Sequence, residues 1–231
     1  ALGEMRDRNV RWAVVETTSH GLHQHRVTGF AFNRAVFTAI THEHLDYHGT
    51  LEDYVEAKAR LLDIQAETSD GEWGKAAILP RDDANWEVLR GRVRGRTIGY
   101  GRANDADVRI LSENSSSRGI EFTASTPWGE VPITASLPGT FNIENCLAAL
   151  ACAASVGAGL AECADAIAAF PGVSGRMERI DCGQPFEVVV DYAHTPNSLQ
   201  SVLQTLSDGS GRLLVAFGGA GERDRLKRPL M

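Results

Sequence analysis

The 231-residue sequence lacks any run of about 18 apolar residues and any leader in which charged residues precede an apolar stretch. We therefore expect neither a membrane-spanning helix nor a signal peptide, and a cytoplasmic location follows by default. Clustered basic residues are also scarce, because the net charge is −7 and arginines stand singly until the last ten residues. This distribution argues against a nucleic-acid-binding face, whereas small anionic ligands remain possible.

Cysteine is rare, and the four cysteines form no C-x-x-C pair, so we expect buried thiols in a reducing compartment. The phosphate-binding motif G-x-x-x-x-G-K-[ST] is absent from these residues. The chain begins with Ala1 and stops at Met231, shortly after a Lys-Arg-Pro turn. We therefore expect a fragment that is truncated at both ends.

The first hundred residues alternate short apolar runs with longer helical patterns, which predicts an α/β fold with a mostly parallel sheet. Thr50 is a candidate N-cap for the longest of these helices. From residue 106 to 136 the sequence alternates apolar and polar residues between turn signals and predicts antiparallel hairpins. The expected strands are 12–16, 35–39, 76–79 and 97–100, and the expected helices are 50–64, 84–90, 142–156 and 160–170.

Proline and two glycines within residues 171–176 interrupt the helical pattern, and we expect a domain boundary near residue 173. The domains would be 1–172 and 173–231. The second opens with a β-α-β pattern, a strand at 186–192, a helix at 196–206 and a strand at 212–218, which is typical of the start of a Rossmann-like domain.

Six of the seven histidines lie between positions 20 and 48. Among them, His42, His44, Asp46 and His48 nearly reproduce the H-x-H-x-D-H ligand set of dinuclear zinc hydrolases. One additional residue before the last histidine would rotate its imidazole away from the shared face. Histidines that only pack or face solvent are the plainer alternative.

Other polar residues also have plain interpretations when each is taken alone. Glu16 could be a solvated carboxylate at a strand end, Lys58 a solvated cation on a helix, and Arg26 a surface residue. Asn142 and Asn145 stand at a helix start, where asparagine is a common cap.

Six separated segments give these residues a common context. They are ETTSHGLHQHRVTG (16–29), AVFTAITHEHLDYHGTLEDYVEAKARLL (35–62), GTFNIENCLAA (139–149), PGVSGRMERID (171–181), VVVDYAHTPNSL (188–199) and FGGAGERDRLKRPLM (217–231). Together and in this order they resemble the Mur ligase family, and within it most closely the UDP-N-acetylmuramoyl-tripeptide synthetases. The resemblance implies a central ATP-binding domain over 1–172, truncated at its N-terminus, and a C-terminal domain over 173–231, truncated at its C-terminus.

The resemblance also implies an activity and a metal site. The parent enzyme would use ATP to add a third amino acid to UDP-MurNAc-L-Ala-D-Glu through an acyl phosphate, in peptidoglycan precursor synthesis, and the fragment alone would be inactive. Glu16, His44 and Lys58 would be the catalytic residues that bind Mg²⁺. Because a cationic amine cannot ligate magnesium, the resemblance implies that CO₂ carbamylates Lys58. Departures from the family pattern at Ala39 and Glu43 affect residues around the ligands.

Ligand-binding roles follow in the same way. For ATP, the resemblance implies that Asn142 and Asn145 contact the adenine edge, Arg176 the phosphates, and Asp191 the ribose or the interdomain hinge. For the UDP-MurNAc-peptide, it implies Thr18, Gln24, Arg26 and His194. The amino acid that is added is not encoded in any of these segments. Two alternatives stay open: a non-catalytic nucleotide-sugar-binding module derived from a ligase, and the zinc hydrolase.

Overall fold

The computed structural model of the chain describes residues 2–40, 45–207, 211–219 and 228–231, with the backbone alone described at residues 45 and 46. Its helices and strands, in chain order, are α1 (Leu2–Asp7), α2 (Ser19–His23), β1 (Arg34–Val36), α3 (Leu45–His48), α4 (Leu51–Glu67), β2 (Ala76–Pro80), α5 (Trp86–Arg92), β3 (Arg96–Gly101), β4 (Val108–Ser116), β5 (Gly119–Thr126), β6 (Gly129–Ala135), α6 (Thr140–Ala154), α7 (Leu160–Ala169), β7 (Glu178–Arg179), β8 (Val189–Val190), α8 (Pro196–Leu206) and the 3₁₀ helix Arg228–Leu230.

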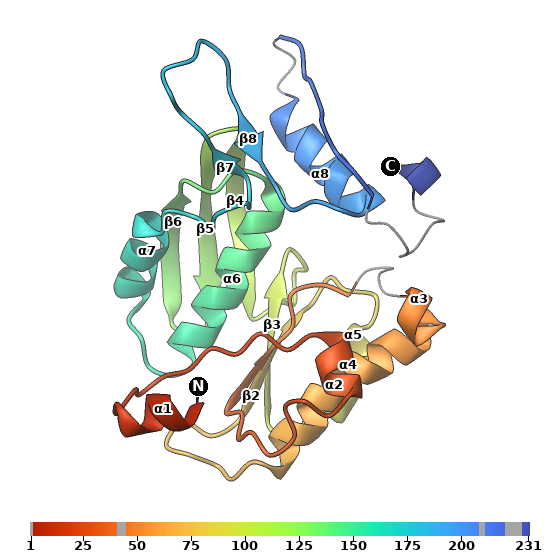
Figure 1. The fold of residues 1–231 in the computed structure, drawn as a ribbon. Helices are drawn as coiled ribbons and strands as arrows, with labels where there is room; N and C mark the ends of the chain where they lie inside the picture. The colour runs from red at the N-terminus through yellow and green to blue at the C-terminus, as the bar shows by residue number, and fades with distance from the viewer. Residues whose placement is uncertain (1, 41–44, 208–210, 220–227) are drawn as a thin grey trace.

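One six-stranded sheet, in the order β1-β2-β3-β4-β5-β6, organises most of the chain (Figure 1). Strands β1 to β4 pair in parallel, and β4-β5 and β5-β6 pair antiparallel. The predicted α/β fold, with a mostly parallel sheet followed by antiparallel hairpins, is confirmed. The predicted strands at 35–39, 76–79 and 97–100 are present as β1, β2 and β3, with ends shifted by a few residues.

Both faces of the parallel part are covered, which explains why β2 is apolar at every position. Ala76 and Ile78 belong to the core that includes α6 and α7, whereas Ala77 and Leu79 belong to the core with α2, α4 and α5. This alternation is the two-residue period of a strand. The chain therefore forms three layers, with helices on either side of the sheet (Figure 1).

Helix α4 begins as the sequence predicts. The Thr50 hydroxyl accepts a hydrogen bond from the backbone N–H of Asp53 at 3.1 Å, which satisfies one of the unpaired donors in the first turn. Helices α6 and α7 confirm the two predicted alanine-rich helices. Within the described residues, no helix combines the length and the apolar character that crossing a membrane requires.

Two expected strands do not form. Residues 12–16 form neither a helix nor a strand in the described part of the chain, and Val14 is fully exposed. Residues 212–218 are likewise unpaired, with Leu214 75% exposed. The apolar pattern was correct for a strand, but a strand also needs a neighbour to receive its hydrogen bonds.

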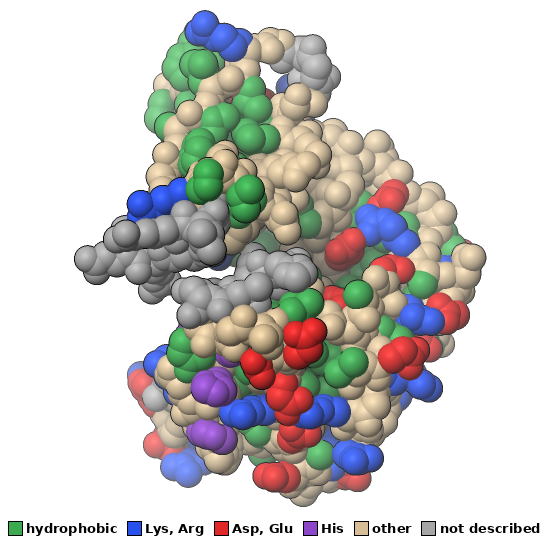
Figure 2. Space-filling model, turned by 90° about the vertical axis from the view of Figure 1, so that its right-hand side faces the viewer, with side chains coloured by type: hydrophobic (Ala, Val, Ile, Leu, Met, Phe, Trp, Pro, Cys, Tyr) green, Lys and Arg blue, Asp and Glu red, His purple; other side chains and the backbone are tan. Residues whose placement is uncertain are grey.

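The expected Rossmann-like β-α-β start is only partly present. Helix α8 forms behind its Thr195 cap, but the strand expected at 186–192 shortens to β8, which pairs antiparallel with β7. Hydrophobic side chains gather on the upper part of the face in Figure 2, where α8 and residues 211–219 lie in Figure 1. The division into domains 1–172 and 173–231 remains a prediction.

Candidate active site

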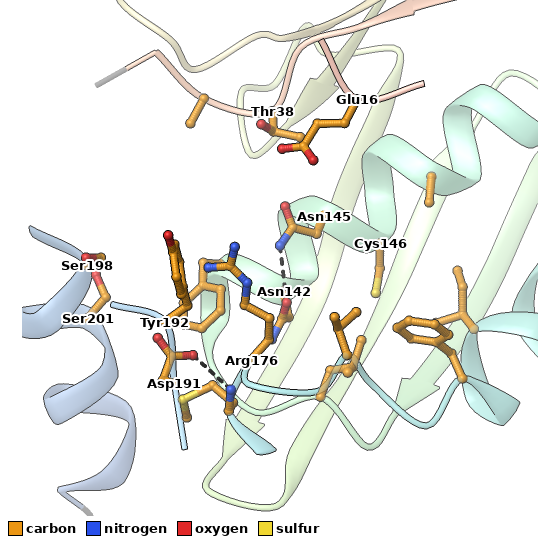
Figure 3. Close-up of a pocket in the computed structure, with 18 of the residues that line it drawn as sticks. Glu16, Thr38, Asn142, Asn145, Cys146, Arg176, Asp191, Tyr192, Ser198 and Ser201 are labelled. Atoms are coloured by element: carbon orange, nitrogen blue, oxygen red, sulfur yellow. Dashed lines mark hydrogen bonds between the residues drawn. The ribbon is translucent and has the colours of Figure 1, made fainter. Parts of the chain in front are cut away.

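A cavity of about 1340 Å³ lies beside the carboxyl end of β1, between α4, α6, α7, the residues that flank β7 and β8, and α8. Figure 3 shows part of its lining, with Glu16 and Thr38 on one wall and Arg176, Asp191 and Tyr192 on the opposite wall. Open parallel sheets usually bind ligands beyond the carboxyl ends of their strands. The volume is sufficient for a ligand of nucleotide size.

The cavity brings together residues from distant parts of the sequence. Of the candidate residues, those that line it are Glu16, Lys58, Asn142, Asn145, Arg176, Asp191 and His194. Thr18, Gln24 and Arg26 do not line it. His44 and His42 lie outside the described residues.

The cavity lining includes Glu16 and Lys58, two of the three predicted magnesium ligands. Glu16 is exposed on the irregular segment that precedes α2, and Figure 3 shows its carboxylate next to Thr38. Lys58 is half-buried on α4, with its Nζ atom 5.2 Å from the centroid of the Tyr54 ring one turn earlier. Carboxylate and hydroxyl oxygens suit Mg²⁺, whereas an ammonium group must first become an oxygen donor. The donor set therefore fits magnesium if Lys58 is modified.

Helix α6 contributes Asn142 and Asn145 to the cavity lining. The Asn142 side chain donates to the Pro138 carbonyl at 2.8 Å, and Asn145 donates through Nδ2 to the Asn142 Oδ1 atom at 3.1 Å. Within the described part of the chain, the Asn145 amide oxygen accepts no hydrogen bond, and Asn145 is exposed at the cavity. No acidic residue occupies the first turn of this helix, so its positive end is available to an anion.

Arg176 precedes β7 in the chain and lines the cavity, and its guanidinium carbon is 4.6 Å from the centroid of the Tyr192 ring. Asp191 accepts hydrogen bonds from the backbone N–H groups of Met177 at 2.8 Å and of Ala193 at 2.7 Å. His194 is exposed, and its Nδ1 atom lies 2.9 Å from the Tyr192 carbonyl oxygen. An anion the size of a phosphate that enters the cavity could therefore bind to Arg176, whose guanidinium is already oriented by the Tyr192 ring.

The three candidate substrate-binding residues near α2 lie just beyond the ends of this helix, and all three are exposed. The Thr18 hydroxyl accepts from the Gly21 backbone N–H at 3.0 Å and caps α2. Gln24 donates to the Tyr47 hydroxyl at 3.0 Å, and Arg26 is exposed. Thr18, Gln24 and Arg26 thus share one short segment, apart from the lining of the cavity.

Of the four residues in the candidate zinc set, only His48 has a described side chain, because His42, His44 and the side chain of Asp46 lie outside the described residues. His48 lies 3.0 Å from the Ser19 hydroxyl through its Nε2 atom, and its ring is 5.5 Å from the Tyr54 ring. Among the described residues, no group of three or more His, Cys, Asp or Glu side chains is arranged to hold a metal ion. His48 is engaged with α2 and α4.

Thr38 and Tyr192 are polar lining residues that were not among the candidates. Thr38 follows β1 directly, and the rule that ligands bind beyond strand ends could have identified it. Tyr192 stands between two candidates in the segment DYAHTP, but its role depends on the ring contact with Arg176, which the sequence does not reveal.

The fold and the cavity together define an α/β protein with a large cavity at the strand ends, part of whose lining comes from a C-terminal segment. Two family models match the chain: Mur ligase middle domain over residues 1–153, and Mur ligase, glutamate ligase domain over residues 175–231. The chain therefore belongs to the Mur ligase family, which confirms the resemblance found in the sequence.

Individual relatives agree with this assignment. A protein of Roseiflexus sp. (strain RS-1) named UDP-N-acetylmuramyl-tripeptide synthetase is 42% identical over 238 residues, covering 99% of this chain and 47% of the relative. A protein of Bacillus velezensis named UDP-N-acetylmuramoyl-L-alanyl-D-glutamate–2,6-diaminopimelate ligase is also 42% identical, over 99% of this chain and 47% of its own length. The chain thus spans about half the length of the curated relatives it matches.

Solved structures show the same fold. A structure titled as a UDP-N-acetylmuramoyl-L-alanyl-D-glutamate–2,6-diaminopimelate ligase matches with a TM-score of 0.78 and 36% identity, over 100% of this chain and 47% of that one. The MurF ligase of Thermotoga maritima in complex with ADP matches with a TM-score of 0.64 over 82% of this chain and 42% of that one, at 15% identity, which is a likeness of fold alone.

Proposed function

We propose that this chain belongs to an ATP-dependent ligase that adds the third amino acid to UDP-MurNAc-L-Ala-D-Glu through an acyl phosphate, in peptidoglycan precursor synthesis. The observation that carries the proposal is the cavity that Glu16 and Lys58 share with Asn142, Asn145 and Arg176. The names of relatives about 40% identical over almost the whole chain support the same substrate class.

The proposed metal ligands are Glu16, His44 and Lys58. Lys58 is carbamylated by CO₂ in this proposal, because its half-buried position on α4 lets a long side chain end at the cavity as a carboxylate. Magnesium, when bound, supplies positive charge to phosphate oxygens. This positive charge offsets the negative charge of Glu16 and of carbamylated Lys58, so an anionic substrate can bind beside them.

The proposed ATP contacts lie on the other wall. Asn142 and Asn145 present amides to the adenine edge, since an amide offers both a donor and an acceptor. Arg176 neutralises charge on the phosphates, and oriented charge of this kind is the main contribution of a protein to phosphoryl and acyl transfer.

Other parts of the proposal concern the substrate and the setting. His194, Thr18, Gln24 and Arg26 bind the UDP-MurNAc-peptide in this proposal. The enzyme works in the cytoplasm, and the 231-residue chain alone does not turn over ATP, because it contains no G-x-x-x-x-G-K-[ST] motif for the phosphates.

The test is ligation by the full-length protein that contains this chain, supplied with UDP-MurNAc-L-Ala-D-Glu, ATP, Mg²⁺, bicarbonate and a panel of amino acids that includes meso-diaminopimelate and L-lysine. Lys58→Ala should abolish product formation. Arg90→Ala is the matched control, because it removes an exposed cation from helix α5, away from the cavity. It should leave the rate unchanged.

Each outcome has a defined meaning. Product with one amino acid, lost only in Lys58→Ala, supports the ligase and identifies its third residue. Nucleotide-sugar binding without product for any amino acid would favour the non-catalytic binding module instead. Tightly bound zinc in the purified protein, lost in His42→Ala, would favour the hydrolase.

A further inference from the structure

Both carboxylate oxygens of Asp191 accept hydrogen bonds from the backbone. The Oδ2 atom accepts from the Met177 N–H at 2.8 Å (dashed line at Asp191 in Figure 3), and the Oδ1 atom accepts from the Ala193 N–H at 2.7 Å. The first bond joins two segments that are 14 residues apart, and the second fixes the turn that follows Asp191 itself. Asp191 therefore acts as a clamp between the β7 and β8 segments.

The ends of the two strands explain what this clamp holds. Strands β7 and β8 pair antiparallel over two residue pairs, Glu178 with Val190 and Arg179 with Val189. The bond between Met177 and Asp191 lies next to the first of these pairs, and Arg176 and Tyr192 are the next residues outward on the two segments. The guanidinium of Arg176 then lies 4.6 Å from the centroid of the Tyr192 ring, at the cavity.

The backbone around Arg176 requires such support. Met177 is a buried, non-glycine residue with φ of 48°, in the left-handed region that side chains disfavour. Three successive amides there have defined acceptors: Gly175 N–H donates to Glu178 Oε2 at 2.7 Å, Arg176 N–H to the Val173 carbonyl at 3.0 Å, and Met177 N–H to Asp191. A strained conformation persists only where its surroundings enforce it.

We infer that Asp191 is a positioning residue, which sets the Arg176 guanidinium and the Tyr192 ring against each other at the phosphate side of the cavity. The inference rests on the proposed function and deepens it. In this role the carboxylate acts through the two backbone amides, and its effect on catalysis passes through Arg176 and not through a contact with the ribose.

The chain offers a matched pair of substitutions. Asp191→Asn replaces one of two occupied acceptor oxygens by an NH₂ group, which then faces a backbone N–H donor. Glu178→Gln makes the same chemical change, but Glu178 uses a single oxygen, Oε2, for both Gly175 N–H and the Ser174 hydroxyl. The glutamine oxygen can accept both bonds, so only the asparagine variant breaks a contact.

The first measurement is kcat/KM for ATP in the full-length protein. We expect Asp191→Asn to lower it by roughly tenfold to a hundredfold, the usual effect of a small misplacement of a charged group, and Glu178→Gln to change it by less than about threefold. The loss in Asp191→Asn should be equal with ATP, 2′-deoxy-ATP and 3′-deoxy-ATP. It should largely vanish in an Arg176→Ala background, because the group that is positioned is then absent.

Opposite results would overturn the inference. A loss that disappears with one deoxynucleotide would make Asp191 a ribose ligand, and a loss that simply multiplies with that of Arg176→Ala would make the two residues independent. Equal effects of Asp191→Asn and Glu178→Gln would assign the loss to charge alone.

The second measurement needs neither activity nor nucleotide. In the wild-type protein, the amide hydrogens of Met177 and Ala193 should be protected from exchange with solvent, and Asp191→Asn should expose both. Unprotected amides in the wild type would refute the clamp even if the variant failed to fold. A wild-type protein that is inactive with every amino acid, yet protected at these amides, would count against the proposed function and not against the clamp.

Discussion

Replacing Tyr100 with phenylalanine removes a buried hydroxyl that joins β3 to the end of β1. The Tyr100 side chain is only 1% exposed, and its hydroxyl lies 2.8 Å from the Phe37 carbonyl oxygen and 3.0 Å from that of Thr38. Thr38 lines the cavity. The substitution therefore tests whether this hydroxyl holds the strand end that carries one wall of the site.

The expected cost follows from the hydrogen-bond inventory. A hydroxyl has one proton, so the two carbonyls share a single donor. Losing it forfeits a bond worth about 1 kcal/mol and leaves a buried acceptor unsatisfied, so we expect the free energy of unfolding to fall by about 2 kcal/mol. For a chain of this size, that corresponds to a melting temperature lower by roughly 4–8 °C.

Urea unfolding followed by circular dichroism measures the change, with Tyr192→Phe as the control. Tyr192 is 62% exposed, and its hydroxyl makes no hydrogen bond within the described residues, so its removal should cost less than about 0.5 kcal/mol. Equal losses in the two variants, or no loss in Tyr100→Phe, would refute the reasoning.

The same residue predicts a dependence on alkaline pH. Burial raises the pKa of Tyr100 well above its ordinary value, and the negative charges of Glu144 and Asp83 add to the increase. The folded state therefore disfavours the tyrosinate, while the unfolded chain ionises near pH 10. This contribution to stability is complete below about pH 10 and is lost as the pH rises further towards the folded-state pKa. Tyr100→Phe should lose less stability in that range, and a steeper loss would contradict the assignment.

Two further predictions concern glycines and thiols. Gly157→Ala should destabilise the chain by roughly 1–3 kcal/mol, because φ is +87° and the added methyl would lie 2.6 Å from the Trp73 ring. Gly91→Ala, inside α5 with open space around it, should instead stabilise the chain by about 0.5–1 kcal/mol. Similar melting temperatures for the two variants would show that the backbone argument fails. Burial raises the pKa of Cys146 to about 11, so iodoacetamide near neutral pH should label the exposed Cys182 first, as measured by mass spectrometry of peptides, and equal labelling would mean that the α6 core opens readily.

The sequence was most informative where structure is local. Thr50 was identified as an N-cap because its hydroxyl and the following helical pattern are neighbours in the chain, and the structure confirms the bond. The uninterrupted apolar run at 76–79 predicted a strand, and the covering of both sheet faces explains its composition. Local signals of this kind sufficed for the α/β class and for most element positions.

The errors arose where an element depends on a distant partner. Residues 12–16 and 212–218 have the composition of strands, but exposed side chains such as Val14 and Leu214 show that the described part of the chain offers them no neighbour. Apolar periodicity reports the side-chain environment that a strand would need, while hydrogen bonding to another segment decides whether the strand exists.

Asp191 shows the same limit at the site. A carboxylate that follows an apolar run can bind a ligand or a backbone amide, and its neighbours in DYAHTP do not distinguish these roles. The distinction comes from Met177, which has a left-handed backbone conformation just before β7 and whose N–H donates to the carboxylate. Arg176 and Tyr192, the neighbours of these two residues in the chain, lie in contact with each other. The orientation of the candidate phosphate-binding arginine therefore depends on a bond between segments 14 residues apart, so a change at Asp191 should alter the position of Arg176 before any ligand binds.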